Sequence, residues 1–95
     1  MRRCLHVDAS RARRLLRDIL TSGILSYSAH SKKEMGQDNL TTVDVVNVLR
    51  AGVVEPSEFE RGSWRHRVKT NTMCVVVVIV SEREAMVVTA WRIRR

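Results

Sequence analysis

The sequence predicts a single α+β domain, in which two or three N-terminal helices pack on one face of a three- to four-stranded antiparallel sheet. Apolar residues recur with the 3.6-residue period of helices up to Gly52 and with the two-residue period of strands after it. Short turns separate the strand-like segments, so neighbours in sequence are expected to pair in space. The 95 residues have room for one core. We therefore divide residues 1–95 into a helical part, 8–52, and a sheet part, 53–95.

Three segments of the helical part carry helix signals: residues 10–22, 29–36 and 41–52. In the first, apolar side chains take one face and arginines the other, and Asp8 or Ser10 can cap its start. Ser28 stands where the second helix needs an N-cap. The third opens on Thr41-Thr-Val-Asp44, a capping box with Asp in place of Glu. Residues 24–28 alternate and are too short for a helix, so we interpret them as an extended link.

Four segments of the sheet part have the patterns of strands: residues 53–59, 63–70, 73–81 and 85–93. The first contains Pro56, which lacks a backbone N–H and so indicates an edge or irregular position. The third is apolar on both faces, as a central strand is. Alternation in the second places three cations on one side: Arg65, Arg67 and Lys69. Alternation in the fourth places four residues on one side: Val87, Thr89, Trp91 and Ile93. Helices are expected to cover one face of the sheet and to leave the cationic face for function.

The net charge of +7 and the isoelectric point near 10.7 favour a polyanionic partner. Residues 1–35 hold eight Lys or Arg and three Asp or Glu, and residues 63–95 hold seven and two. The stretch 36–62 holds two and five, so an acidic segment separates two basic ones. This distribution predicts one positive face. The alternative is a charge excess that serves only to keep the protein in solution.

The cysteines and the apolar runs bear on where the protein works. Cys74 lies in the apolar run 73–80, where a free thiol packs as a small apolar group, and with Cys4 alone it makes no disulfide framework. No apolar segment follows the initial Met-Arg-Arg, and a run of eight apolar residues is too short to span a membrane. We therefore expect a cytoplasmic protein.

Three histidines, His6, His30 and His66, are the candidate proton-transfer groups. They are not spaced as metal ligands, and the sequence has no phosphate-binding glycine loop or nucleophile elbow, so neither a metal nor a cofactor is expected. RNA cleavage needs only a base for the 2′-hydroxyl, an acid for the departing 5′-oxygen and cations for the phosphorus centre. Histidine can supply the first two and strand-borne Arg and Lys the third. An isolated histidine is nevertheless more often structural than catalytic.

The segment Tyr27-Ser-Ala-His-Ser-Lys-Lys-Glu-Met35 resembles the motif Ser-x-His-Ala-x-x-Arg-Met of a bacterial family of small uncharacterised domains. Further similar segments follow in the family's order, so that the likeness covers residues 24–93: Leu40–Val46, Trp64–Val68, Val75–Val78 and Val87–Trp91. The family resembles RelE/MqsR-type toxins, which have a RelE/barnase-like fold that colicin-type ribonucleases share. The resemblance implies a metal-independent endoribonuclease that cleaves mRNA, free or ribosome-bound. It also implies the toxin role in a type II toxin–antitoxin system, with an antitoxin protein encoded nearby as partner.

The resemblance also implies roles for single residues. His30 matches the family histidine and would be the catalytic acid or base, Arg67 would hold the scissile phosphate, and Thr89 would position the ribose or phosphate. His66 replaces a family tyrosine and is a candidate second titrating group. Five further residues are predicted to bind the substrate: Lys33, Arg65, Lys69, Trp91 and Arg92.

Two departures from the family bear on activity, since Glu34 and Asp38 stand where the family has arginines. Lys32 and Lys33 restore the positive charge from neighbouring positions, Glu34 acts as a carboxylate partner of His30, or the site has decayed. Two other functions therefore stay open. One is a non-catalytic RNA- or ribosome-binding module, and the other is an interaction protein whose basic helix, residues 10–22, docks an acidic partner.

Overall fold

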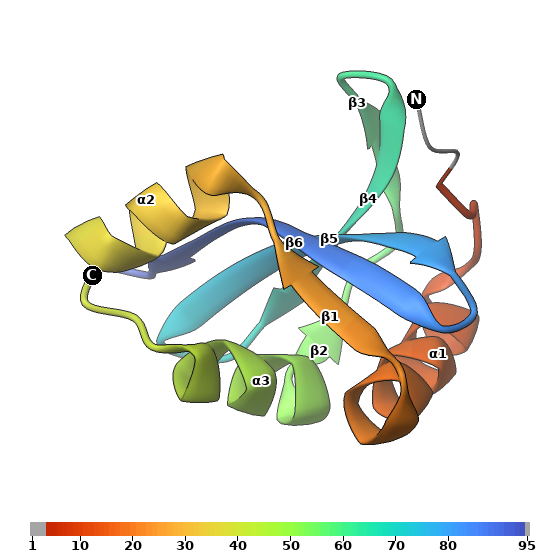
Figure 1. The fold of residues 1–95 in the computed structure, drawn as a ribbon, viewed down its shortest axis with the longest axis horizontal. Coiled ribbons are helices and arrows are strands. Elements are labelled where there is room, and N and C mark those ends of the chain that lie inside the picture. The colour runs from red at the N-terminus through yellow and green to blue at the C-terminus, as the bar shows by residue number, and fades with distance from the viewer. Residues whose placement is uncertain (1–3, 95) are drawn as a thin grey trace.

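The computed structural model describes residues 4–94, which form three helices and a mixed sheet (Figure 1). The helices are α1 (Ala9–Ser22), α2 (Ala29–Gln37) and α3 (Thr42–Ala51). The strands are β1 (Ile24–Tyr27), β2 (Val53–Val54), β3 (Glu58–Glu60), β4 (Ser63–Lys69), β5 (Met73–Ser81) and β6 (Glu84–Arg92). The sheet order is β1-β6-β5-β4-β2, and β3 pairs with β4 off this path. The pair β1–β6 is parallel and the other pairs are antiparallel.

The predicted α+β class and its three helices are confirmed, but the sheet is larger than predicted. Residues 24–28 are not a simple link, because Ile24–Tyr27 form β1 and pair in parallel with the last strand of the chain. The segment 53–59 is two short strands on either side of Pro56, which has no N–H to continue a ladder. These differences give six strands in place of three or four, and one parallel pair in place of none.

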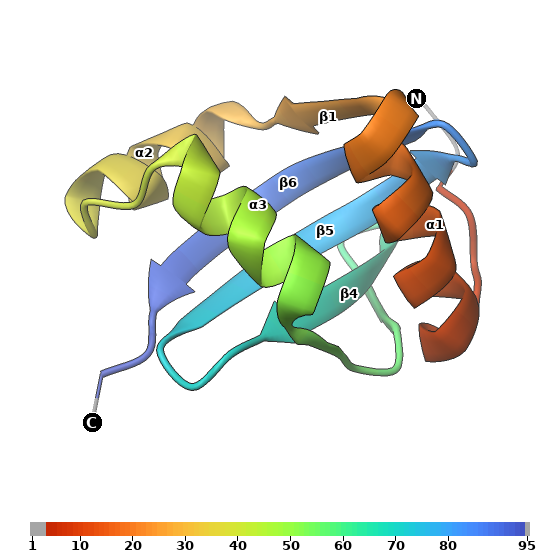
Figure 2. The ribbon, with the colours of Figure 1, turned by 90° about the horizontal axis from the view of Figure 1, so that it is seen from below.

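Helices α1 and α3 cover one face of the sheet (Figure 2). Each helix buries an apolar stripe against the sheet: Ala12, Leu15, Leu16 and Ile19 from α1, and Val45, Val48 and Leu49 from α3. Opposite them, β5 and β6 contribute Val75, Val77, Ile79 and Val87. Burial of this aliphatic area is the main stabilising term of the fold. We call the opposite side of the sheet the open face.

The predicted caps are present. The Asp8 side chain accepts from the Arg11 N–H at 2.8 Å, which begins α1 at Ala9. Thr41 and Asp44 form a reciprocal capping box at the start of α3, with bonds of 2.9 and 3.1 Å. The backbone and side-chain hydrogen bonds of Thr41 hold the pKa of the Asp44 carboxyl below its usual value.

The Arg13 side chain of α1 caps the C-terminal end of the neighbouring helix, α3. Its guanidinium donates to the carbonyls of Leu49, at 2.5 Å, and of Arg50 and Gly52, where α3 ends. These carbonyls have no partner inside the helix, so the contact satisfies groups that would otherwise need water. Burial lowers the pKa of Arg13, and the nearby Arg17 lowers it further. Arg13 is therefore part of the α1–α3 packing, and it is not a freely exposed cation of the predicted basic stripe.

Strand β6 contains a bulge that reverses its predicted alternation. Val76 of β5 pairs with Thr89, but the next residue, Val77, pairs with Val87, so Val88 is an extra residue. Val87 faces the helices, whereas Val88, Thr89 and Trp91 lie on the open face. The prediction that Val87, Thr89 and Trp91 share one side is therefore wrong.

Strand β4 leaves the sheet part-way along its length. It pairs with β5 only as far as His66 opposite Val77, and its first residues pair with β3 instead. We call this hairpin, residues 58–65, the arm; it stands out from the sheet on the side away from α1 and α3 (Figure 1). Its turn has Arg61 at φ 50° and Gly62 at φ 81°, in the left-handed region where glycine carries no Cβ penalty.

The segment before α1 lies beside β5 at the end where β4 no longer pairs with it. The Leu5 N–H donates to the Ile79 carbonyl of β5 at 2.7 Å. The next residue, His6, stacks on Trp64 of the arm, with ring centroids 3.6 Å apart, and Phe59 meets Trp64 edge-on at 5.1 Å. The N-terminal segment thus fixes the base of the arm. None of the helices in the described part of the chain is long and apolar enough to cross a membrane.

Replacing Gly23 by Ala is expected to lower the free energy of unfolding by roughly 1–3 kcal/mol. The added Cβ would lie 2.5 Å from the Arg83 carbonyl oxygen, which already accepts the Ile24 N–H. Gly36→Ala is the matched control, because its Cβ would meet nothing within 4 Å inside α2 and should gain up to about 1 kcal/mol of helix propensity. Urea unfolding measures both, and equal effects would contradict the packing argument.

Candidate functional site

The open face carries two rows of side chains that cross β4, β5 and β6. Arg67, Val76 and Thr89 are direct partners in one row, and Lys69, Cys74 and Trp91 are direct partners in the next. Partners in adjacent strands lie about 5 Å apart, so each row places a β4 cation about 10 Å from a β6 side chain. The structure therefore brings together four residues predicted from the sequence: Arg67, Lys69, Thr89 and Trp91.

A cleft of 210 Å³ lies over these rows, between the sheet and the arm. Arg67, Thr89 and Trp91 line it from the sheet, and Arg65 lines it from the base of the arm. The Arg65 Nε donates to the Ser63 hydroxyl at 3.1 Å, which orients the guanidinium. Two arginines and a hydroxyl on rigid strands can hold a phosphate group.

The cleft also contains two carboxylates that the sequence analysis missed. Glu58 and Glu60 line it from β3, where Glu58 stands opposite Arg65. The sequence does contain a signal for their position, since Glu58-Phe-Glu60 alternates as a strand does and a two-residue turn joins it to the cationic strand. These carboxylates weaken the predicted positive face, and they add acceptors that can take up a proton.

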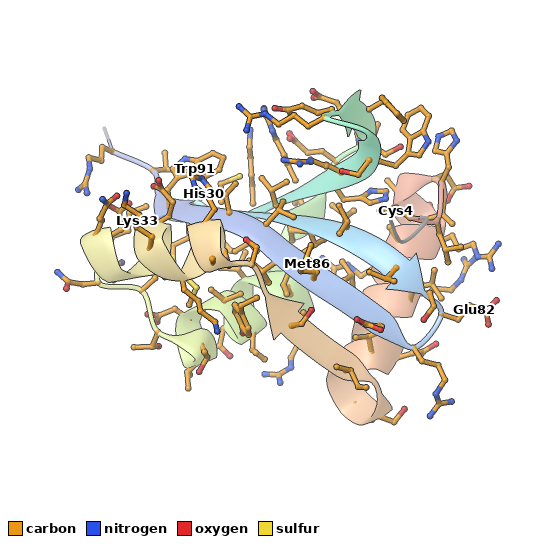
Figure 3. The ribbon with its side chains drawn as sticks, turned by 45° about the horizontal axis from the view of Figure 1, so that its top comes forward. Cys4, His30, Lys33, Glu82, Met86 and Trp91 are labelled. Carbon is orange, nitrogen blue, oxygen red and sulfur yellow. The ribbon has the colours of Figure 1, made fainter. Side chains whose placement is uncertain are left out.

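The start of α2, the helix that carries His30, is bonded to the β6 bulge. The Ser28 N–H donates to the Val87 carbonyl at 2.9 Å, and the Ser28 hydroxyl donates to the Val88 carbonyl at 3.1 Å. The same hydroxyl accepts from the Ser31 N–H as the N-cap of α2. Figure 3 shows the His30 and Trp91 side chains in one region, from α2 and β6.

The His30 side chain is 65% exposed, and its Nε2 lies 3.7 Å from the Glu34 Oε1 one turn later. Lys33 is exposed on the outer part of α2, three residues after His30 and so on the same side of the helix. This distance fits one of the three alternatives for Glu34, that of a carboxylate neighbour of His30. This arrangement leaves the ring open to a ligand on its other side.

His66 does not join the other site residues. It is 0% exposed and belongs to the alternate face of β4, away from Arg65 and Arg67. Neither of its ring nitrogens has a hydrogen-bond partner among the described residues. Burial is the largest cause that lowers the pKa of His66, and the nearby His6 lowers it further. The interpretation of His66 as a second titrating group of the site is therefore wrong in geometry.

Arg92 is held in a structural contact. Its Nε donates to the Asp38 carbonyl at 2.9 Å and its Nη2 to the Asn39 carbonyl at 3.2 Å, where α2 ends. The Asp38 carboxylate accepts from the Arg92 N–H at 2.8 Å and from Arg94 at 3.0 Å. Asp38 thus fastens α2 to the end of β6, and the predicted substrate-binding residue Arg92 is engaged in this structural contact.

Lys69 and Cys74 of the second row each have a defined environment. Lys69 forms an ion pair of 3.5 Å with Glu55, which reduces its free positive charge. Burial raises the pKa of the Cys74 thiol, although Lys69 and Arg67 oppose the shift. Cys74 therefore packs as an apolar residue beneath Trp91, as the sequence predicted for a free thiol. No cluster of three or more His, Cys, Asp or Glu that could hold a metal occurs within residues 4–94.

Comparison with known families assigns residues 27–92 to the model described as a domain of unknown function, DUF4258. This chain is a DUF4258 domain. The matched region begins with the last residue of β1 and holds His30, the cleft and the β6 bulge, whereas α1 lies before it. No curated protein and no solved structure matches the chain. The likeness of this DUF4258 domain to RelE/MqsR-type toxins therefore remains a proposal.

The buried His66 predicts how the stability of the DUF4258 domain depends on pH. The native state keeps this ring neutral, so as pH falls below the ordinary value of 6.5 the unfolded chain takes up a proton that the native state does not. Stability is expected to fall between pH 7 and 5, and to fall less in His66→Leu. Urea unfolding midpoints measure this, with the exposed His30→Gln as control; parallel pH profiles for wild type and His66→Leu would contradict it.

Ser28 is predicted to support both α2 and the bulge. Ser28→Ala loses the N-cap and the bond to Val88, and should lower the free energy of unfolding by about 1–2 kcal/mol. Ser28→Thr keeps the hydroxyl and should stay close to wild type. Urea unfolding gives the energies, and amide exchange at Val88 and Thr89 gives the local effect. Equal losses in the two variants would show that the hydroxyl is not the stabilising group.

Proposed function

We propose that this DUF4258 domain is a metal-independent endoribonuclease, the toxin of a type II toxin–antitoxin system, that cleaves RNA by attack of the 2′-hydroxyl. One observation carries the proposal: the β6 bulge puts Thr89 in the same cross-strand row as Arg67 and is itself bonded to the start of the helix that bears His30. The proposal thus joins a phosphate-binding pair on the sheet to a histidine on the helix that is bonded to β6.

RNA cleavage by the 2′-hydroxyl needs a phosphate-binding group and groups that transfer protons. Arg67, supported by Arg65, would bind the scissile phosphate and stabilise the charge that develops on it. His30 would give a proton to the departing 5′-oxygen or take one from the 2′-hydroxyl, and Thr89 would hold the ribose or phosphate in line. Glu58 is the better placed of the two arm carboxylates to act as the other proton-transfer group, because it stands opposite Arg65, at the base of the arm.

A second function, RNA binding without cleavage, is favoured by the position of His66. His66 is buried on the other side of β4, so His30 is the exposed histidine that the proposal relies on, and His6 is stacked on Trp64. A site with one histidine, already paired to Glu34, can bind phosphates without moving two protons. Salt-dependent binding of intact RNA would identify this function.

The proposed protein partner is an antitoxin encoded nearby. Arg11, Arg14 and Arg17 of α1 are exposed, and Arg11 forms an ion pair with Glu82, so Arg14 and Arg17 are the cations of this helix that an acidic partner would contact. Arg13 donates hydrogen bonds to the carbonyls at the end of α3, so its charge reversal would disturb the fold. Reversal at Arg14 and Arg17 thus separates partner binding from RNA binding, which uses the other side of the sheet.

The cleavage test compares wild type with His30→Ala and Arg67→Ala on a synthetic RNA. Each variant is expected to cleave at least about 100-fold more slowly, the usual contribution of an acid–base or oxyanion-type group. Both side chains are exposed, so neither change should unfold the domain. Wild-type products should carry 2′,3′-cyclic phosphate ends and should form equally in EDTA.

Arg17→Ala, on the helix-covered side, is the control and should cleave like wild type. Expression in bacteria should arrest growth, and His30→Ala and Arg67→Ala should relieve the arrest. If both variants cleaved RNA as fast as wild type, the assigned site would be wrong. If wild type bound RNA and left it intact, the binding function would replace the catalytic one.

A further inference from the structure

A second and larger cavity, of 460 Å³, lies on the open face beyond the cleft. Its floor is apolar and comes from β5 and β6: Val78, Val80, Met86 and Val88. Figure 3 shows two of the lining residues, Met86 on β6 and Cys4 from the N-terminal segment. An apolar floor of this size with a polar rim is typical of small-molecule sites.

The cavity exists because β4 leaves β5 after His66. Beyond that pair, Val78 and Val80 have no β4 side chains beside them, and the arm instead stands over the gap. Val78 and Val88 are buried, whereas Val80 and Met86 are partly exposed. A flat, apolar ligand would therefore gain mainly by covering Val80 and Met86.

Arg65 lines both the cavity and the cleft, so the two are adjoining compartments of one surface. The cleft offers Arg65, Arg67 and Thr89 to an anion, and the cavity offers an apolar floor with Ser26 and Ser63 at its rim. A nucleotide has this same division, with a charged phosphate on one side and a flat base with polar edges on the other. Arg61 at the rim adds a further cation, so the charged residues that line the cavity are two arginines, Arg61 and Arg65, and one carboxylate, Glu84.

We propose that this cavity is a nucleobase subsite, which binds the base next to the phosphate held by Arg65 and Arg67. The inference rests on the proposed RNA function for its substrate class, but it concerns binding alone. The cations at the rim and the continuity with the phosphate cleft favour a nucleotide over an apolar side chain of a protein partner. The Met86 thioether would contact the face or edge of the base.

The direct test titrates a nucleoside monophosphate into the protein and follows methyl resonances by NMR. The Met86 methyl group and the methyls of Val78 and Val88 are expected to shift, because an aromatic ring would lie against them. Ribose 5-phosphate and inorganic phosphate should leave these methyls unmoved while they perturb Arg65 and Arg67. Equal shifts from ribose 5-phosphate and the nucleotide, or no methyl shift at nucleotide saturation, would overturn the proposal.

A second test fills the cavity. Wild type should bind a short 2′-O-methyl RNA, which cannot be cleaved, about tenfold more tightly than the same chain without bases, since covering apolar surface with one base contributes on that scale. Met86→Trp should abolish this preference, and Met86→Leu, of similar volume, should keep it. A thermal unfolding midpoint close to wild type shows that Met86→Trp is folded; if it is not, Ser26→Phe fills the cavity from β1.

A third readout uses the thiols. Cys74 is fully buried and Cys4 is at the cavity rim, so iodoacetamide labelling reports on Cys4, and the nucleotide should slow it. A base preference in a protein that leaves RNA intact would support the subsite and refute the nuclease. If wild type and Met86→Trp cleaved RNA at the same rate, with no preference among bases, the subsite would be refuted and the nuclease would stand. If Met86→Trp lost antitoxin binding instead, the cavity would belong to the protein partner.

Discussion

The extra residue in β6 is the constraint on which the open face depends. Because Val88 is bulged, Val87 turns into the core while Thr89 and Trp91 turn out, and a strand without the bulge would bury Thr89 among the aliphatic side chains. The carbonyls of Val87 and Val88 both point to the β1 side, where Ser28 bonds to them. One backbone irregularity thus sets the face of Thr89 and the position of the helix that carries His30.

The departure of β4 from the sheet shapes the rest of the surface. A strand that stayed paired with β5 along its whole length would leave a flat face with no hollow. By turning to β3 after His66, β4 forms a wall over the cleft and uncovers the apolar floor of the cavity. The N-terminal segment supports this geometry, since Leu5 takes the free carbonyl of Ile79 and His6 stacks on Trp64.

The net charge of the chain is a poor guide to the charge of the site. Arg13 and Arg92 are used at the ends of helices, where they satisfy backbone carbonyls, and Lys69 is paired with Glu55. Glu58 and Glu60 bring negative charge to the cleft itself. The cations that remain for a polyanion there are Arg65 and Arg67, so the expected positive face narrows to a small region between the sheet and the arm.

The sequence by itself determined the three helices with their caps, the central β5 and the cations on one side of β4, because these follow from local periodicity and from side chains that bond within a few residues. Only the tertiary structure decided the rest. Val87 and Val88 are both apolar, so no pattern reveals which of them is the extra residue, and the parallel partner of β1 lies about 60 residues away along the chain. His66 alternates with the arginines in the sequence, but which side of a strand faces the core is settled by what packs against it.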